Sequence, residues 1–270
     1  MTLSAVFRAD LRQTGRSWRL RGLGAAFVFF FLGTAAIFTT LGRLPGGASE
    51  PGNYAAALVS PLGLFCPLVG VLVGYRAIIG ERVSGTIRLL LSLPQGRVEV
   101  VLGKLFSRIT LVSITATLGA TVGYAFLFFI GGSIGVLEYV SVTALAMLLQ
   151  ATFIAISIGL SAGSDSEPVV VAASLGSVLL FTTLWGTVVR VVEGLLAAAG
   201  IDPLGKALTE FAFGINPIVS FSRLTSLAVG AESRLETVWG EPWFAALVLL
   251  CWFTVPLGIG SRRFKRAALS

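Results

Sequence analysis

Charged residues, glycines, a proline and leucines occur together in one stretch of this apolar chain, from Gly80 to Lys104. Its sequence is GERVSGTIRLLLSLPQGRVEVVLGK. Ser84 can cap a short helix there, Leu89 and Leu90 share one face of it, and Pro94 ends it within about three turns. Apolar anchors surrounded by charges have the chemistry of a protein docking surface. The candidate docking residues are Glu81, Arg82, Ser84, Gly85, Thr86, Leu89, Leu90, Pro94, Arg97 and Lys104.

Residues for catalysis or metal binding are scarce in the chain. It contains no histidine, and its two cysteines, Cys66 and Cys251, both lie inside apolar runs, where a thiol is most often a small buried hydrophobe. We therefore predict no catalytic residue and no metal site. The G-x4-G-K-[ST] phosphate loop is also absent, so we expect this chain to be no enzyme and to bind no cofactor, ATP included, in that manner.

The composition indicates an integral membrane protein that is built entirely from helices. Hydrophobic residues make up 55% of the chain and charged residues 12%, with a mean hydropathy of +0.90, which leaves too little polar surface for a soluble globule. We expect one transmembrane domain, residues 1–270, with a docking loop at 80–97 and a long outer segment at 190–242. The six predicted spans are residues 22–41, 54–79, 98–130, 136–160, 169–189 and 243–259.

The first 21 residues have the pattern of a helix that lies in the inner membrane interface and contacts lipid. Phe7, Leu11 and Trp18 recur at helical spacing on one face. Arg12 and Arg19 fall on a neighbouring face, close to anionic headgroups. The alternative is a basic leader that is simply solvated.

The distribution of positive charge predicts the orientation. Fifteen of the 20 lysines and arginines fall in the leader, around the docking loop or at the C-terminus, and five fall elsewhere. By the positive-inside bias, both termini and the docking loop are cytoplasmic. The net charge of +7 follows from these flanking residues, so we predict no nucleic-acid partner.

Smaller signals predict local structure. Asn216 and Pro217 form a capped helix start in the outer segment, which we interpret as amphipathic helices on the outer interface, with a re-entrant pair as the alternative. Asp165 and its neighbouring serines can cap a helix that starts near Pro168. Small residues that permit close helix packing are Gly119, Gly123, Ser157 and Gly159.

The docking stretch resembles the E-x3-G-T-x2-LL(L)-x2-P-x2-R-x5-GK signature of ABC-2 type transporter permeases. It carries that signature on Glu81, Gly85, Thr86, the leucines 89–91, Pro94, Arg97, Gly103 and Lys104. The length, the six-span layout and the outer segment with its Asn216–Pro217 step are similar to the subgroup that contains the permease for maturation of the nitrous-oxide reductase copper site.

The resemblance implies a coupling helix that rests in a groove of a separate ATPase subunit, on which ATP and Mg are bound. It also implies a second permease copy, in a homodimer or a heterodimer, a plasma-membrane location and export as the direction. Glu81 would pair with a basic group on the ATPase; an ion pair with Arg82, Arg88 or Arg97 within the loop is the alternative.

Two other functions stay open. An ion-coupled solo carrier usually needs a charge deep in the membrane, and we find none in the centres of the predicted spans. A membrane scaffold that anchors an ATPase without transport would share the docking loop, and substrate-stimulated ATP hydrolysis would separate it from a transporter.

Overall fold

The computed structural model describes residues 6–11, 18–42, 54–85, 96–130, 135–200, 202–230 and 238–266. These residues are helical almost throughout, and they include six helices that are long and apolar enough to cross a membrane. The prediction of an all-helical protein with six spans is therefore confirmed. The N-terminal helix, residues 6–11, precedes the first of them.

The six long helices match the predicted spans in number and order, with differences at their ends. They are α2 (Trp18–Gly42), α3 with α4 (Tyr54–Gly74 and Arg76–Val83), α6 (Arg97–Phe129), α7 (Val136–Gly163), α8 with α9 (Glu167–Leu179 and Trp185–Ala198), and α12 (Pro242–Arg266). A π-helical turn, η2 (Leu180–Leu184), joins α8 to α9, so the fifth helix continues nine residues beyond the predicted end at 189.

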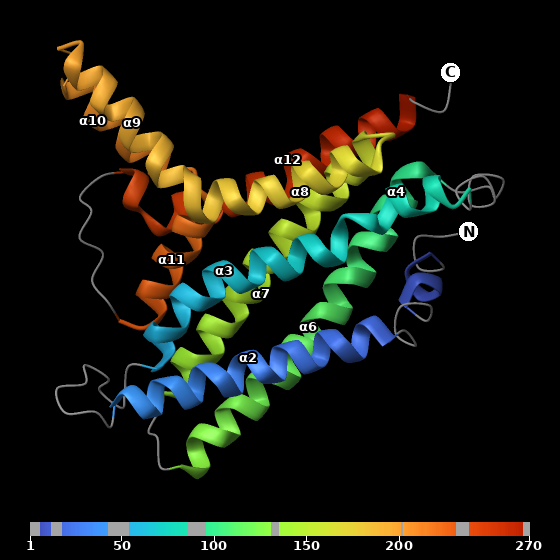
Figure 1. Cartoon of the computed structure of the whole chain (residues 1–270), viewed down its shortest axis with the longest axis horizontal. Coiled ribbons are helices and arrows are strands. Elements are labelled where there is room, and N and C mark those ends of the chain that lie inside the picture. Colours follow the sequence, from blue (N-terminus) through green and yellow to red (C-terminus); the bar gives the residue numbers. More distant parts are fainter. Residues whose placement is uncertain are drawn as a thin grey trace.

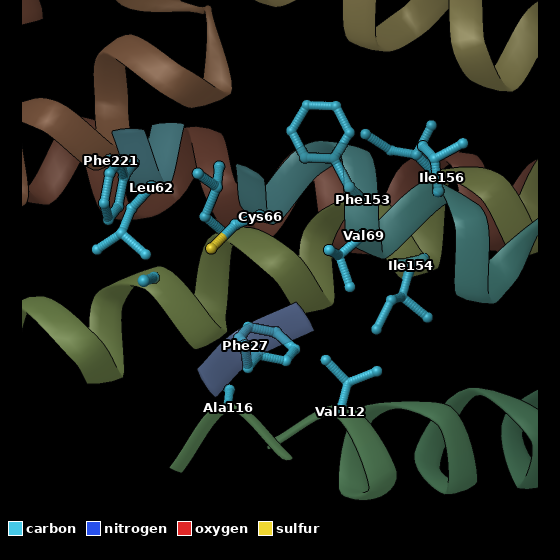
Figure 2. Packing of buried hydrophobic residues seen from close by; sticks show 14 of the residues in the cluster. Phe27, Leu62, Cys66, Val69, Val112, Ala116, Phe153, Ile154, Ile156 and Phe221 are labelled. Carbon is cyan, nitrogen blue, oxygen red and sulfur yellow. The ribbon is translucent and has the colours of Figure 1, made fainter. Parts of the chain in front are cut away.

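Helix α7 lies at the centre of the bundle and is mostly buried. It packs against α3 and α12 along much of its length, and also contacts α6, α8 and α4, while α2 packs mainly on α6 (Figure 1). Figure 2 shows where these helices meet: Phe27 of α2, Val69 of α3, Val112 of α6 and Ile154 of α7 point into a shared apolar core.

Glycines bring the helix backbones into direct contact at the predicted positions. Methyl groups added at Gly119 and Gly123 would lie 2.8 Å from Cβ of Phe27 and Phe31 of α2. A methyl group at Gly159 would lie 2.6 Å from the carbonyl carbon of Pro256 in α12. Since real Cβ atoms almost never approach so closely, these positions require glycine for the helices to pack as they do. The prediction of close packing there is confirmed.

The segment between α9 and α12 contains α10 (Asp202–Gly214), α11 (Pro217–Ala228) and η3 (Val238–Gly240). Helices α9 and α10 lie side by side and project from the bundle at the end opposite α4, whereas α11 packs against α3, α7 and α12 (Figure 1). Phe221 of α11 is fully buried. Helix α11 is thus part of the bundle core.

Asn216 caps α11, as the sequence predicts, and makes one further bond. Its Oδ1 accepts the backbone N–H groups of Ile218 (2.7 Å) and Val219 (3.3 Å), and its Nδ2 donates to the carbonyl oxygen of Phe181 in η2 (3.0 Å). The side chain is buried. One amide therefore starts α11 and fastens it to the fifth long helix.

We expect Asn216→Ala to lower the free energy of unfolding by about 2 kcal/mol or more, because it removes a cap and a buried hydrogen bond. Asn216→Ser keeps a neutral acceptor for the cap but is too short to donate to Phe181, so its thermal midpoint in detergent should fall between wild type and the alanine variant. Equal midpoints for the serine variant and wild type would show that the bond to Phe181 contributes nothing.

Candidate docking site at the α4 end of the bundle

Helix α4 begins directly after a break at Tyr75 and is held against α7 by a serine. Backbone N–H groups in the first turn of a helix have no partner within it. The Ser161 hydroxyl accepts two of them, from Ile78 (3.2 Å) and Ile79 (2.9 Å), and both isoleucine side chains are buried. The predicted span 54–79 therefore continues as two helices, and the second one carries the start of the docking stretch.

Arg82 fastens α4 to the connection between α7 and α8. Its guanidinium group donates to the carbonyl oxygens of Ser164 (2.8 Å) and Ala162 (3.2 Å), and it forms an ion pair with Asp165. It also lies over the ring of Phe264 in α12, 5.2 Å from the ring centroid. Because these contacts use most of its donors, Arg82 mainly holds α4 in place.

Arg76, at the other end of α4, pairs with the start of α8. Its Nε lies 2.7 Å from Oε1 of Glu167. Helix α8 begins at Glu167, one residue before the predicted start near Pro168, and Ser166 precedes it without a side-chain cap. The predicted cap at this helix start is wrong, because Asp165 pairs with Arg82 and the Ser164 hydroxyl accepts the N–H of Ser166.

Glu81 and Lys104 contact each other. The Lys104 Nζ lies 2.5 Å from Oε1 of Glu81 and 3.6 Å from Oδ1 of Asp10 in the N-terminal helix, and Arg108 lies 3.3 Å from the same Asp10 oxygen. The Lys104 side chain is only 5% exposed. The alternative prediction paired Glu81 with Arg82, Arg88 or Arg97. In the structure its partner is Lys104 of α6, so both side chains form an ion pair within this chain.

The C-terminal end of α4 explains two further residues of the docking stretch. Ser84 is the C-cap residue directly after α4, and its hydroxyl donates to the carbonyl oxygen of Glu81 (3.3 Å). Gly85 follows with φ of +75°, a conformation that glycine adopts without strain at a helix end. The predicted coupling helix itself lies outside the described residues, together with Thr86, Leu89, Leu90 and Pro94. Of Arg97, the structure describes the backbone, as the first residue of α6.

The N-terminal helix packs on α6 through a face other than the one predicted to contact lipid. Val6 and Asp10 are its buried residues, whereas Phe7 and Leu11 are half-buried. Trp18 and Arg19 belong to the first turn of α2, and Trp18 is exposed; their contact with the membrane interface stays a prediction. Arg12 lies outside the described residues.

The sequence alone did not identify the residues that contact α4, Lys104 and Arg108. They lie on four helices and on the α7–α8 connection: Asp10, Ser161, Asp165, Glu167 and Phe264. One signal was present, because Asp10 is the single acidic residue among the first 49. A lone carboxylate among five arginines points to an internal ion pair.

Through these contacts, α4 is connected to most of the long helices. Hydrogen bonds and ion pairs connect this eight-residue helix to α6, α7 and α8, a ring contact connects it to α12, and it continues directly from α3. Figure 1 shows α4, the N-terminal helix and the last turns of α12 at the same end of the bundle. A displacement of α4 therefore has direct contacts through which it can reach most of the long helices.

The chain matches known proteins over its whole length. The family model described as "ABC-2 family transporter protein" matches residues 4–269. The chain is 23% identical over 283 residues to the probable ABC transporter permease protein NosY of Pseudomonas aeruginosa, which covers 97% of both chains. It is 29% identical over 114 residues to the probable ABC transporter permease protein NosY of Stutzerimonas stutzeri, which covers 42% of this chain and 41% of that protein.

Proposed function

Because the chain belongs to the ABC-2 transporter family, and is thus a permease subunit of an ABC transporter, we propose that it couples ATP hydrolysis on a separate ATPase subunit to export of a substrate. The docking stretch from Glu81 to Lys104 is the site of that coupling. ATP and Mg are bound by the ATPase, and this chain supplies the pathway across the membrane.

The observation that carries the proposal is the set of contacts around α4. Closure of the ATPase subunits would push on the segment that follows Gly85. Since α4 is tied to α6 through Glu81 and Lys104 and to the α7–α8 connection through Arg82, that push tilts several long helices together. Packed elements respond to such a push by moving as bodies, which is how a local displacement opens a pathway.

Membership of the ABC-2 family also supports an arrangement for the complex of permease and ATPase. Two permease copies, alike or different, face each other across a two-fold axis, each on one ATPase. This multi-pass protein lies in the plasma membrane with both termini and α4 in the cytoplasm, in contact with lipid. The excess of lysine and arginine at the α4 end supports this orientation.

We expect Leu89→Asp combined with Leu90→Asp to abolish co-purification of the ATPase while the permease still inserts, because the charges remove both apolar anchors. The measurement is detergent purification of the tagged chain, with mass spectrometry of what accompanies it. Leu91→Asp is the matched control: it places the same charge in the same leucine run but, by helical spacing, off the face predicted for Leu89 and Leu90, and should retain the ATPase.

An ATPase that still accompanies the double variant would contradict the proposed docking site. If wild-type permease, well folded, brings no ATPase with it, the chain acts instead as a solo carrier or as a scaffold.

A further inference from the structure

The N-terminal helix places a carboxylate, that of Asp10, next to the Lys104 that pairs with α4. Asp10 is 7% exposed, in a helix of which Arg8 and Ala9 face outward. Its Oδ1 lies 3.3 Å from Arg108 and 3.6 Å from Lys104. A carboxylate is withdrawn from water only where paired charges compensate the lost hydration. The sequence interpretation gave this helix a contact with lipid alone, which does not account for Asp10.

The backbone of the same helix is fixed on α6 next to this pair. A methyl group at Gly103 would lie 2.9 Å from Cβ of Val6 and 3.3 Å from the backbone nitrogen of Phe7. Val6 is 6% exposed. The glycine thus lets the N-terminal helix approach α6 closely, one residue before Lys104. Close packing and ion pairing together place Asp10 beside Lys104.

Lys104 is the shared member that joins this helix to α4. Its Nζ contacts Asp10 on one side and Glu81 on the other, so two carboxylates from different helices hold one ammonium group. Two negative and two positive side chains make up the cluster, Asp10 and Glu81 with Lys104 and Arg108, which leaves it neutral. Removing Asp10 leaves Arg108 without its carboxylate and frees Lys104 to shift.

We propose that Asp10 is a positioning residue: through Lys104 and Glu81, the N-terminal helix fixes the place of α4, the helix from which the docking stretch continues. Loosening the N-terminal helix therefore loosens α4, although the two helices are more than 60 residues apart in sequence. The consequence for ATPase binding rests on the proposed function, whereas the effect on α4 does not.

The test variant is Asp10→Asn combined with Arg108→Met, because it removes one charge of each sign and keeps the cluster neutral. Hydrogen exchange of the permease alone in nanodiscs should be faster on the order of tenfold for the amides of α4 (Arg76–Val83) and unchanged for the centre of α7. Affinity for the ATPase recovered with wild type should fall on the order of tenfold, within the usual range of coupling between sites. Asp10→Glu should retain both properties.

A disulfide between the N-terminal helix and α6 can restore the position of α4 without restoring the charges. A variant that is merely less stable overall would not be rescued in this way. Val6→Cys with Gly103→Cys places two Cβ atoms close enough to cross-link after a shift of about 1 Å. With Cys251→Ala to remove the exposed thiol, the oxidised cross-link in the double-variant background should restore slow exchange in α4 and ATPase affinity. Reduction of the same sample should remove both gains.

Unchanged exchange in α4 in the double variant would overturn the role of Asp10, and so would a cross-link that restores nothing. This outcome is separate from the docking experiment. If Leu89→Asp with Leu90→Asp fails to release the ATPase, the proposed function is wrong, while faster exchange in α4 would still support Asp10 as its anchor.

Discussion

Gly260→Leu is expected to separate α12 from α7 and to give a permease that aggregates or unfolds in mild detergent. A methyl group at Gly260 would overlap the carbonyl oxygen of Gly159 and lie 2.8 Å from its Cα. These are backbone atoms, so no side chain can move aside. We expect a loss of at least about 3 kcal/mol, the upper part of the usual range for overpacking. Fluorescence-detected size exclusion with a thermal ramp measures it.

The same helix offers a matched control. Gly258 also lies in α12, but a methyl group there would meet nothing within 4 Å. Gly258→Leu should therefore elute and melt like wild type, since it adds the same side chain on the open face. If both leucine variants behave alike, either both intact or both lost, then the approach of Gly260 to Gly159 does not hold α12 on α7.

Lys104→Met is expected to destabilise the protein by about 3–5 kcal/mol, because it leaves Glu81 and Asp10 with only Arg108 to balance them in a buried cluster. Breaking one side of such a pair costs more than replacing both sides with neutral groups. Lys104→Met with Glu81→Gln, which keeps one positive and one negative charge, should recover much of the loss. The measurement is the thermal midpoint of the purified permease.

Two results would contradict this interpretation of Lys104. One is a wild-type midpoint for Lys104→Met, which would show that the cluster contributes no stability. The other is a double variant as unstable as the single one, which would assign the loss to packing of the lysine chain and not to charge. Loss of ATPase binding in a double variant that is otherwise stable would be the signature of a positioning role for the pair.

The bundle itself was predictable from hydropathy because each span carries its own signal. Twenty or so apolar residues must form a helix in a membrane, whatever the rest of the chain does. The cap at Asn216 and the packing glycines were predictable for the same local reason. Helix ends were less accurate: hydropathy continues through Ile78 and Ile79, while the helix breaks at Tyr75, where Ser161 of α7 takes over two backbone donors.

The partners of the charged residues were not predictable, since they come from distant parts of the chain. Arg76 pairs with Glu167 across 91 positions, Arg82 hydrogen-bonds to Asp165 across 83, and Arg108 reaches Asp10 across 98. Spacing within the docking stretch suggested only partners within the loop for Glu81. Which opposite charges meet is determined by the packing of α4 against α6, α8 and the α7–α8 connection, and by that of the N-terminal helix on α6.

The central place of α7 has a consequence for biosynthesis. Helices α2, α3 and α6 leave the ribosome before α7, but α12, against which α7 packs so closely at Gly159 and Gly260, is made about 80 residues after α7. Chains are assembled from the N-terminus, so α7 must wait in the lipid with one face uncovered. The core described here is therefore completed only after α12 has been made, and a ribosome that stops before residue 242 leaves the central helix without one of its two main partners.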